Sequence, residues 1–575
     1  MTALVLAVSG WLGVRALLAK AALDEARPAA ERVMAAVTER GAGALTETSV
    51  RQDIRLLAER SETLASLTSD PVWRVAERLP EVGPTMSASR IGAAEASRLL
   101  GDAVVPVLDT TDELADGLRV SDGRIDVGAL EDLHTALATA DETARTALER
   151  LGRVPRGGVD SRVGEHLNRM QALLTHTTPA LDTLADVTEA APAVLGAEGP
   201  RLILIMLQNN AELRSGGGIT GTFFAVEIDN GRFTGVDHTD SAAFSPADVS
   251  PVPIPAGTRE TFGDEVGRYV QNLTTTPDFA LSGRLASAWW AEHTGRTPDM
   301  VVAIDPAVVR TLLEVTGPLR AGEAHLTAGN VVEALLRRPY LTMDADEQTE
   351  YFFGVSEALA QRLVSSANTL PQVAGAAAPL IEEGRVAVWS RHPQEQALIA
   401  DTPLAGLLGR LETAGDDAYA VLFNNLSGSK LDAYLDAGFS AVVDRCRPDG
   451  RGSVAVSTGL VSEVPTDVDL PWYAAPGFGG YAREDLALLV TVLAPPGTVP
   501  EGAWLDGAPL SSHVSHDAGR SAVTARVALP PGHSAHVTFR FVAAEPGPVE
   551  PALLHTPLID TADVVTTGQA CEVPR

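Results

Sequence analysis

The first third of the chain repeats apolar residues at helical spacing. From about Ala21 to Thr188 the sequence is rich in Ala, Leu, Glu and Arg, as in the stretch LEDLHTALATADETARTALERL. Apolar positions that recur every three or four residues form one face of an amphipathic helix. Pro and Gly interrupt the pattern at Asp70–Trp73, Leu79–Pro84 and Arg153–Ser161. We therefore expect several long helices joined by short loops, an arrangement more typical of a spacer bundle than of a catalytic unit.

The pattern changes at Ala197, where short apolar runs begin. The run GPRLILIMLQ predicts a buried strand that stops at a polar cluster followed by glycines. The cluster and the glycines are Asn209, Asn210, Glu212, Arg214, Gly216, Gly217 and Gly218. The next runs, TGTFFAVEI and RFTGVDHTD, flank the triplet Asp229–Gly231, whose Asn-Gly step predicts a β-hairpin.

Strand-like and helical stretches alternate after this hairpin. The segment Met300–Pro306, MVVAIDP, is strand-like, and helical stretches at Gly283–Thr294 and Asn330–Arg338 flank it. This alternation predicts an α/β layer. From about Asp432 onward the runs SVAVSTGLV, LALLVTVLAP, AVTARVALP and AHVTFRFVAA recur between Gly/Pro turns. That rhythm is typical of an antiparallel sandwich.

The opening residues are a candidate membrane anchor. Met1–Val14 carries no charge, and the apolar character resumes at Ala16–Ala19, after Arg15. A membrane-spanning helix needs about 20 residues, and Arg15 can reach the interface by snorkelling. A cleaved signal peptide is the alternative, although no basic region precedes the apolar run. We expect an anchor helix, although Arg15 and Lys20 on its C-terminal flank oppose the positive-inside tendency for an external body.

The predicted fold class is therefore multidomain α+β. It comprises an N-terminal membrane helix over residues 1–20 and an extracytoplasmic helical bundle or stalk over 21–196. A central α/β layered domain follows over 197–431, and a C-terminal antiparallel β-sandwich-like domain over 432–575. A chain of 575 residues, of which 45% are hydrophobic, is long enough to form several separate cores.

Charge and cysteine content narrow the range of partners. The formal net charge is −31 and the isoelectric point is near 4.7. Nucleic-acid binding depends on clustered cations, so we exclude nucleic acid as a partner. The two cysteines, Cys446 and Cys571, show no metal-binding spacing. They either form a disulfide, which fits an extracytoplasmic location, or remain two buried free thiols.

Several segments resemble one family of bacterial envelope proteins. The most specific is LQNNAELRSGGGITGTFFAVEIDNGRF, Leu207–Phe233. The same pattern continues at Ser69–Gly83, Thr276–Leu319, Val386–Gly406 and Asn424–Leu435. Over nearly its whole length the chain resembles the domain of unknown function 4012 family. The resemblance implies a single-pass protein of the cell membrane with its bulk outside the cytoplasm, and it implies no particular biochemical activity.

The central region is also similar in layout to the LytR-CpsA-Psr phosphotransferases, which attach wall glycopolymers from polyprenyl-pyrophosphate carriers. The phrase VVAIDPAVVRTLLEVTGPL resembles their strand, helix and turn. Arg214 stands where they have a pyrophosphate-binding arginine, and Arg337 and Arg338 stand on a helix that carries arginines in that family. The segment Val236–Ser241 replaces their Ser-Ile-Pro-Arg-Asp motif, so one expected arginine is missing.

A diphosphate site can be assembled from these residue types. The guanidinium fork of Arg214 suits phosphate oxygens, and the backbone of Gly216–Gly218 can converge on an anion. Asn209, Asn210, Glu212, Arg337 and Arg338 complete the candidate ligand-binding set. Arg214, Asp237 and Asp240 are the candidate catalytic residues. Asp237 and Asp240 are also candidate Mg²⁺ ligands, and His238 is a candidate base. Mg²⁺ is accordingly the expected cofactor.

Each candidate also has a structural alternative. Asn209, Asn210 and Glu212 can cap a strand end while Arg214 pairs with Glu212. Asp237 and Asp240 can be solvated acids of a surface turn, and Arg337 and Arg338 can lie favourably on a helix dipole. Lys430 is one of only two lysines and lies in the polar turn NNLSGSK, where a specific local pairing is expected.

Two functions from different classes remain after motif analysis. The sequence has no GxSxG elbow, HExxH helix, Walker loop, dinucleotide fingerprint or EF-hand loop. One candidate is a Mg²⁺-dependent transferase of polyprenyl-pyrophosphate-linked glycopolymers, which requires an arginine-lined apolar groove for the lipid. The other is a non-catalytic envelope protein that binds cell-wall glycan or partner proteins, and the missing arginine motif favours it.

Overall fold

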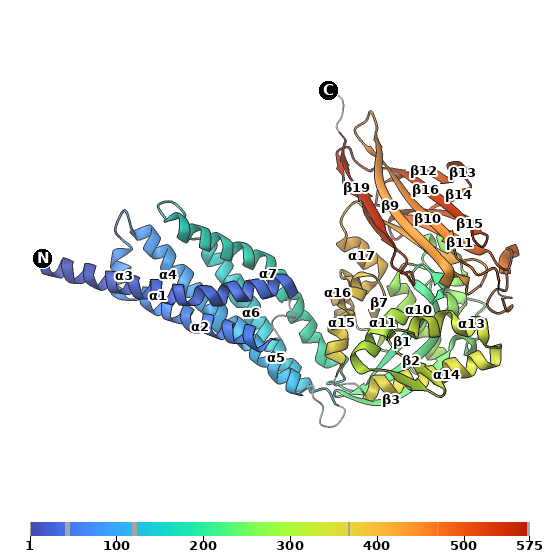
Figure 1. Ribbon diagram of the computed structural model, residues 1–575, viewed down its shortest axis with the longest axis horizontal. Helices are drawn as coiled ribbons and strands as arrows, with labels where there is room; N and C mark the ends of the chain where they lie inside the picture. The colour runs from blue at the N-terminus through green and yellow to red at the C-terminus, as the bar shows by residue number, and fades with distance from the viewer. Residues whose placement is uncertain (1, 41–46, 118–123, 366–368, 468–469, 572–575) are drawn as a thin grey trace. The chain divides into compact units, whose positions relative to one another are not determined.

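The computed structural model describes residues 2–40, 47–117, 124–365, 369–467 and 470–571. The chain folds into two compact units, Met1–Gly199 and Pro200–Arg575 (Figure 1). This division lies within three residues of the change of pattern at Ala197. The mixed α and β architecture with its helices at the N-terminal side is as predicted.

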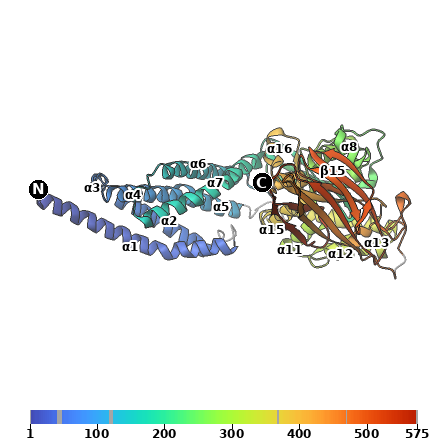
Figure 2. The same ribbon diagram turned by 90° about the horizontal axis from the view of Figure 1, so that it is seen from above.

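The first unit consists of helices that run along its length (Figures 1 and 2). Asp70 and Asp160 begin two of them, because their carboxylates accept hydrogen bonds from the backbone N–H groups of Trp73 and Arg162. The three predicted interruptions are confirmed as gaps between helices. The helices are α1 (Thr2–Arg40), α2 (Thr48–Thr68), α3 (Pro71–Ala76), α4 (Gly83–Arg98), α5 (Val105–Gly117), α6 (Val127–Gly152) and α7 (Ser161–Val194), and a π-helical segment, Leu99–Val104, joins α4 to α5.

Polar contacts attach the N-terminal part of α1 to the rest of the first unit. The Trp11 indole donates to the Asp70 carboxylate at 3.2 Å, and the Arg15 guanidinium lies 3.1 Å from the same carboxylate. Arg15 therefore forms an ion pair within the bundle. Met1 and the side chains of residues 2–10, about half of the expected anchor over 1–20, lie outside the described residues. Among the helices whose residues are described, none is both long and apolar enough to cross a membrane.

The second unit begins with a five-stranded sheet. Its strands are β1 (Arg201–Arg214), β2 (Gly217–Asp229), β3 (Arg232–Asp240), β4 (Met300–Ile304) and β7 (Val386–Ser390), in the order β3-β2-β1-β4-β7. Only β1 and β4 run parallel among these neighbours. The predicted hairpin is confirmed, because Asn230 and Gly231 connect β2 to β3 with φ angles of 47° and 74°. Both angles are positive, as a type I′ turn requires.

Helices cover both faces of this sheet. On one face, α10 (Phe279–Thr294) packs Leu285 and Trp290 against Leu204 and Phe223 of the sheet. On the other face, α11 (Pro306–Thr316), α12 (Val331–Leu336) and α14 (Ala345–Ser365) form a second core that includes Leu207. The predicted α/β layer is thus confirmed. The remaining elements around it are α8 (Ala256–Phe262), α9 (Glu265–Arg268), α13 (Arg338–Thr342), α15 (Leu370–Glu382), α16 (Pro393–Ala400), α17 (Leu407–Thr413), β5 (Leu319–Ala321) and β6 (Ala324–Leu326).

The first strand is longer than predicted. We expected it to stop at the polar cluster, but β1 continues through Asn209 and Glu212 to Arg214 with two irregularities in its pairing to β2. Distant residues satisfy the polar groups along this extension: the Leu213 N–H donates to Asp432 at 2.8 Å, and Asn209 donates to Tyr340. Polar residues can continue a buried strand when such partners are present.

The C-terminal part of the second unit is a sandwich of two sheets around one core. One sheet has the order β13-β12-β16-β10-β9-β19 and the other the order β14-β15-β11-β8-β18. All four predicted strand runs of this region are confirmed, as β10, β11, β15 and β16. The strands are β8 (Ala418–Asn425), β9 (Leu435–Cys446), β10 (Gly452–Ser462), β11 (Leu486–Leu493), β12 (Val499–Leu505), β13 (Ala508–Leu510), β14 (Ser512–Asp517), β15 (Arg520–Leu529), β16 (Ser534–Val542), β18 (Ala552–His555) and β19 (Val564–Thr567), and β17 (Pro548–Val549) pairs separately with β20 (Gln569–Ala570).

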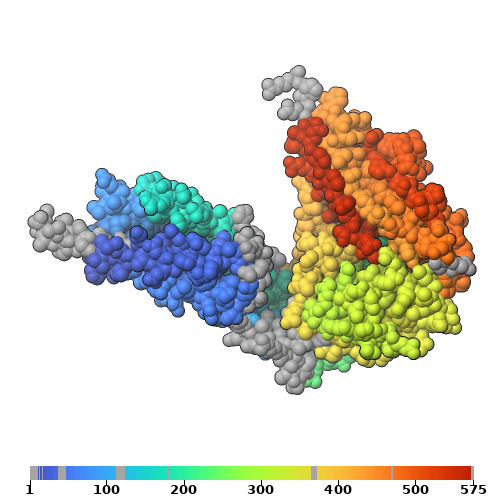
Figure 3. Space-filling model, in the orientation of Figure 1, coloured from blue at the N-terminus to red at the C-terminus, as the bar shows by residue number. Residues whose placement is uncertain are grey.

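Two expectations about this sandwich need correction. It is not purely antiparallel, because β18 runs parallel to β8 and β19 runs parallel to β9. Figure 3 shows the chain around β19, in red, beside the orange part of the sandwich. The boundary expected between residues 431 and 432 does not separate two compact units. The reason is that β8, which precedes it, is an inner strand of the sandwich and pairs with β11.

A disulfide joins Cys446 at the end of β9 to Cys571, across 125 residues of sequence. Of the two alternatives left open for the cysteines, the structure has the disulfide. The Cys571 side is buried against the sandwich core. The bond thus ties the segment that follows β20 to β9, the strand with which β19 pairs.

Candidate functional site

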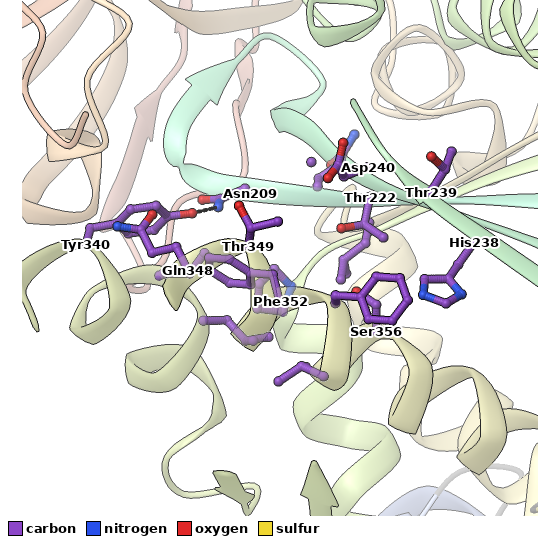
Figure 4. Close-up of a pocket in the computed structure, with 18 of the residues that line it drawn as sticks. Asn209, Thr222, His238, Thr239, Asp240, Tyr340, Gln348, Thr349, Phe352 and Ser356 are labelled. Carbon is purple, nitrogen blue, oxygen red and sulfur yellow. Dashed lines mark hydrogen bonds between the residues drawn. The ribbon is translucent and has the colours of Figure 1, made fainter. Parts of the chain in front are cut away.

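A cavity of about 270 Å³ lies between the sheet face of β1, β2 and β3 and the helix α14 (Figure 4). Its walls combine polar and apolar side chains. The strands contribute Leu207, Gln208, Asn209, Thr222, His238, Thr239 and Asp240, and the helical side contributes Leu335, Leu336, Tyr340, Gln348, Thr349, Phe352, Phe353, Val355 and Ser356. Tyr473, from the sandwich part of the unit, completes one side.

A hydrogen bond joins the two walls at one end of the cavity. Asn209 Nδ2 donates to the Tyr340 hydroxyl at 2.5 Å, as the dashed line in Figure 4 shows. The side-chain oxygen Oδ1 of Asn209 accepts from the backbone N–H of Ala211 at 3.0 Å, so the amide is held from both sides. Burial raises the pKa of the Tyr340 hydroxyl, which therefore stays protonated at neutral pH. The side chains of Asn209 and Tyr340 are thus fixed in place.

His238 marks the other end of the cavity. Its ring contacts two phenylalanines: it is stacked with Phe224 at a centroid distance of 6.5 Å and tilted against Phe353 at 4.6 Å. Nε2 of His238 is buried and has no hydrogen-bond partner among the described residues. Phe353 is 57% exposed although it is aromatic. The end at His238 therefore offers an open aromatic surface, and the unpartnered ring nitrogen lies buried beneath the surface.

Arg214 lies outside this cavity, in a buried ionic cluster. Arg214 is 7% exposed. Its guanidinium contacts the Glu212 carboxylate at 2.7 Å, the side-chain oxygen of Asn272 at 3.2 Å and the backbone carbonyl of Leu213 at 2.9 Å. Lys430 pairs with the second oxygen of Glu212. Burial by itself raises the pKa of Glu212, but Lys430 and Arg214 outweigh it and hold that pKa below its ordinary value. This arrangement is the ion-pair alternative for Arg214 and the specific local pairing expected for Lys430.

Gly216 lies in the tight β1–β2 turn, and Gly217 and Gly218 begin β2 in close packing with β1. The Gly216 N–H donates to the Thr274 carbonyl at 2.9 Å, so it is already committed. A Cβ atom on Gly217 would lie 2.4 Å from the Gln208 side chain. A Cβ atom on Gly218 would lie 2.4 Å from the backbone carbonyl of Asn209. Glycine is therefore required at position 218 by the β1–β2 packing and favoured at position 217 by its positive φ of 128°. Asn210, whose amide donates to the Pro557 carbonyl at 3.1 Å, faces the sandwich side.

Asp237 and Asp240 do not converge on one ion. The pairing of β3 with β2 has no irregularity between them, and residues three apart on a strand point to opposite faces. Asp240 caps the following turn by accepting the N–H groups of Ala242 and Ala243, and Asp237 accepts the N–H of His238. Across the part of the chain that the structure describes, no three His, Cys, Asp or Glu residues are grouped to hold a metal ion. The strand pleat therefore separates the two carboxylates of the predicted Mg²⁺ pair.

The two helix-end arginines are also separate from the cavity. Arg337 donates to the Ala433 carbonyl at 2.9 Å, pairs with Asp560 at 3.2 Å and stacks on Tyr434. Arg338 is exposed at the start of α13. Of the predicted site residues, the structure brings only Asn209 and Asp240 into the cavity wall, together with His238.

Sequence reasoning missed the helical wall of the cavity. Gln348, Thr349 and Ser356 lie on α14 and face the strands (Figure 4). Their spacing of one, seven and eight residues puts them on one helical face. In the sequence ADEQTEYFFGVSEA, a polar helix face that lines a cavity looks the same as a helix face exposed to solvent. Only the fold therefore identifies these residues as part of the cavity wall.

Comparisons with known proteins find limited similarity. The search of curated proteins found no match. Among solved structures, protein gbs0355 from Streptococcus agalactiae is 12% identical, with a TM-score of 0.24 over 38% of this chain and 76% of that one. TagV of B. subtilis is 15% identical, with a TM-score of 0.21 over 36% of this chain and 80% of that one. Overlaps of this extent establish no shared activity.

The family comparison covers the cavity strands. Residues 198–340 match the model of the family described as "Protein of unknown function (DUF4012)". The matched segment contains β1 to β4 and ends at Tyr340, the partner of Asn209. The predicted resemblance to the domain of unknown function 4012 family is therefore confirmed over residues 198–340.

Proposed function

We propose that the Pro200–Arg575 unit binds a neutral glycan of the cell envelope in the cavity between α14 and the sheet. The supporting observation is the chemistry of the lining. It offers amide, hydroxyl, imidazole and aromatic groups, and among its described residues there is no Arg or Lys. Specific sites combine an apolar surface with a few fixed polar groups. Sugar rings match that combination, because they carry hydroxyl groups at their edges and C–H groups on their faces.

The same lining disfavours a pyrophosphate. Phosphate oxygens are normally bound by guanidinium or ammonium groups or by free backbone N–H groups. The charged side chain in the wall is Asp240, which would repel a diphosphate. To contact a diphosphate in the cavity, Arg214 would have to break its ion pair with Glu212 and move out of its buried position. We therefore favour glycan binding over phosphotransfer, and we propose no role for Mg²⁺.

An envelope location is part of the proposal. The disulfide between Cys446 and Cys571 supports an oxidising compartment, since such bonds are rare in the cytosol. The resemblance of the chain to envelope proteins supports the same location. We propose that the apolar segment Met1–Val14 holds the protein at the membrane and that the body lies outside the cytoplasm. Protease digestion of the body in intact spheroplasts tests this orientation, and complete protection would contradict it.

Binding measurements test the glycan proposal directly. The full chain is titrated in a calorimeter with neutral cell-wall oligosaccharides, and separately with a short-chain polyprenyl pyrophosphate in the presence of Mg²⁺. We expect saturable binding of an oligosaccharide and none of the pyrophosphate. Tight binding of the pyrophosphate alone would replace this proposal with the transferase function.

Two substitutions locate the binding in the cavity. Thr222→Val keeps the shape of the side chain and removes a hydroxyl from the wall, so oligosaccharide affinity should fall about fivefold to tenfold, the scale of one net hydrogen bond. Thr234→Val makes the same change on β3, where the hydroxyl contacts Glu227 instead of lining the cavity. Affinity should be unchanged in this control. Equal effects of the two substitutions would place the binding elsewhere.

A further inference from the structure

A second, smaller cavity lies beneath the β1–β2 turn and is lined by Arg410. Its volume is about 20 Å³, and its wall includes the turn residues Ser215 and Gly216 together with Thr276 and Arg410. Arg410 is on α17 and is only 9% exposed. A glycine-rich turn and an arginine do meet in this fold, but the arginine is Arg410 and not Arg214.

The Arg410 guanidinium has no hydrogen-bond or ion-pair partner among the described residues, and its nitrogen atoms keep a small exposure to solvent. The two carboxylates that act on Arg410 electrostatically, Glu382 and Glu383, are both exposed, and Glu383 pairs with Arg385 at 2.6 Å. Burial lowers the pKa of Arg410 to about 10, so the group is still charged at neutral pH. An isolated buried charge is strongly unfavourable, and arginines inside proteins normally have a counter-charge.

Two hydroxyl groups in the same wall have hydrogens to donate. Ser215 Oγ accepts the Asn424 amide at 2.8 Å, and Thr276 Oγ1 accepts the Asp278 N–H at 3.2 Å. Neither hydroxyl donates to an acceptor within the described part of the chain, and both residues are 1% exposed. Each hydroxyl can therefore accept its present bond and donate into the cavity. The wall thus combines one cation with two buried donors, which is the arrangement that suits an anion.

We propose that Arg410, Ser215 and Thr276 hold a small inorganic anion of the size of chloride. Size decides between anions. A cavity holds one water molecule when its volume reaches about 10–15 Å³ on this scale, so 20 Å³ accommodates a monatomic ion and not a phosphate group. The bound anion neutralises Arg410 and links the β1–β2 turn to α17. This site is separate from the glycan cavity and does not depend on the function proposed for it.

Anion-dependent stability tests the site in the full chain. The midpoint of thermal unfolding is measured in sodium chloride and in sodium gluconate at equal ionic strength. A ligand at a hundredfold excess over its Kd should raise the midpoint of a unit of this size by about 3 °C. We expect a saturable chloride-dependent rise of this order for the wild type. Identical midpoints in the two salts would show that the cavity holds water only, and would overturn the proposal.

Variants assign the effect to Arg410. Arg410→Met removes the charge that needs the anion, so the chloride dependence should disappear. Arg320→Met is the matched control, because Arg320 is exposed on β5, and its chloride response should equal that of the wild type. Chloride-35 line broadening on the folded wild type gives a second measurement, with bromide as competitor. If Arg410→Met fails to fold, saturable broadening that bromide reverses supports the site, and broadening indistinguishable from buffer refutes it.

Discussion

Replacing Glu212 by Gln should strongly destabilise the second unit. Glu212 is 4% exposed and faces two cations, Arg214 at 2.7 Å and Lys430. The substitution keeps the size of the side chain but removes the carboxylate charge that forms ion pairs with both cations. At an effective dielectric constant of about 20, one pair at 2.7 Å contributes on the order of 6 kcal/mol before desolvation. Removing one partner of a buried pair typically costs about 3–5 kcal/mol, and we expect a loss in this range.

Urea unfolding, followed by far-ultraviolet circular dichroism, measures this loss. A double variant, Glu212→Gln with Lys430→Gln, should recover part of the stability, because it removes one of the two uncompensated cations. The control is Asp264→Asn at the exposed Arg259–Asp264 pair, where the change should be within about 0.5 kcal/mol. A loss below about 1 kcal/mol for Glu212→Gln would refute the reasoning. So would a double variant whose loss equals the sum of the single losses.

Three further predictions concern other parts of the second unit. Burial raises the pKa of Asp432 to about 7. Its ionisation in the folded state should therefore reduce the free energy of unfolding as the pH rises from about 4 to about 7. Urea unfolding across that pH range should show a flatter pH dependence for Asp432→Asn than for the wild type. Reduction of the disulfide should lower stability by about 4–5 kcal/mol in the chain-entropy model, measured by urea unfolding with and without dithiothreitol; an equal midpoint would contradict it. Gly218→Ala should lower the thermal midpoint because its Cβ would meet the Asn209 carbonyl at 2.4 Å, whereas Gly235→Ala, which meets nothing within 4 Å, should be close to neutral.

Local signals in the sequence were sufficient for most elements of the fold. The Asn230–Gly231 step placed the hairpin, and the alternating runs after Asp432 placed the long strands of the sandwich. These features depend on neighbouring residues only, because turn geometry and strand periodicity are local. The parallel edge strands β18 and β19 depend on how a distant segment returns to the sheets, which no local pattern specifies.

The candidate site was harder to predict for the same reason. Arg214 precedes a glycine-rich turn, which is a favourable sequence for binding an anion. Its buried cluster, however, also contains Lys430 and Asn272, which are distant from it in the sequence. Asn209 does line the cavity, and its role there depends on Tyr340, 131 residues later. The polar cluster was thus identified correctly as unusual, but the direction in which each side chain points is decided by tertiary partners.

The bond between Cys446 and Cys571 also closes a covalent ring. All strands from β10 to β20 lie between the two cysteines, so most of the sandwich is part of the ring. A protease that cuts the backbone once inside it converts the ring into a branched chain without releasing a fragment. The two sides of the cut remain joined through sulfur as well as through the shared sheets. A protein exposed to extracellular proteases would thus keep its sandwich in one piece after a single nick, and would lose it only after reduction or a second cut.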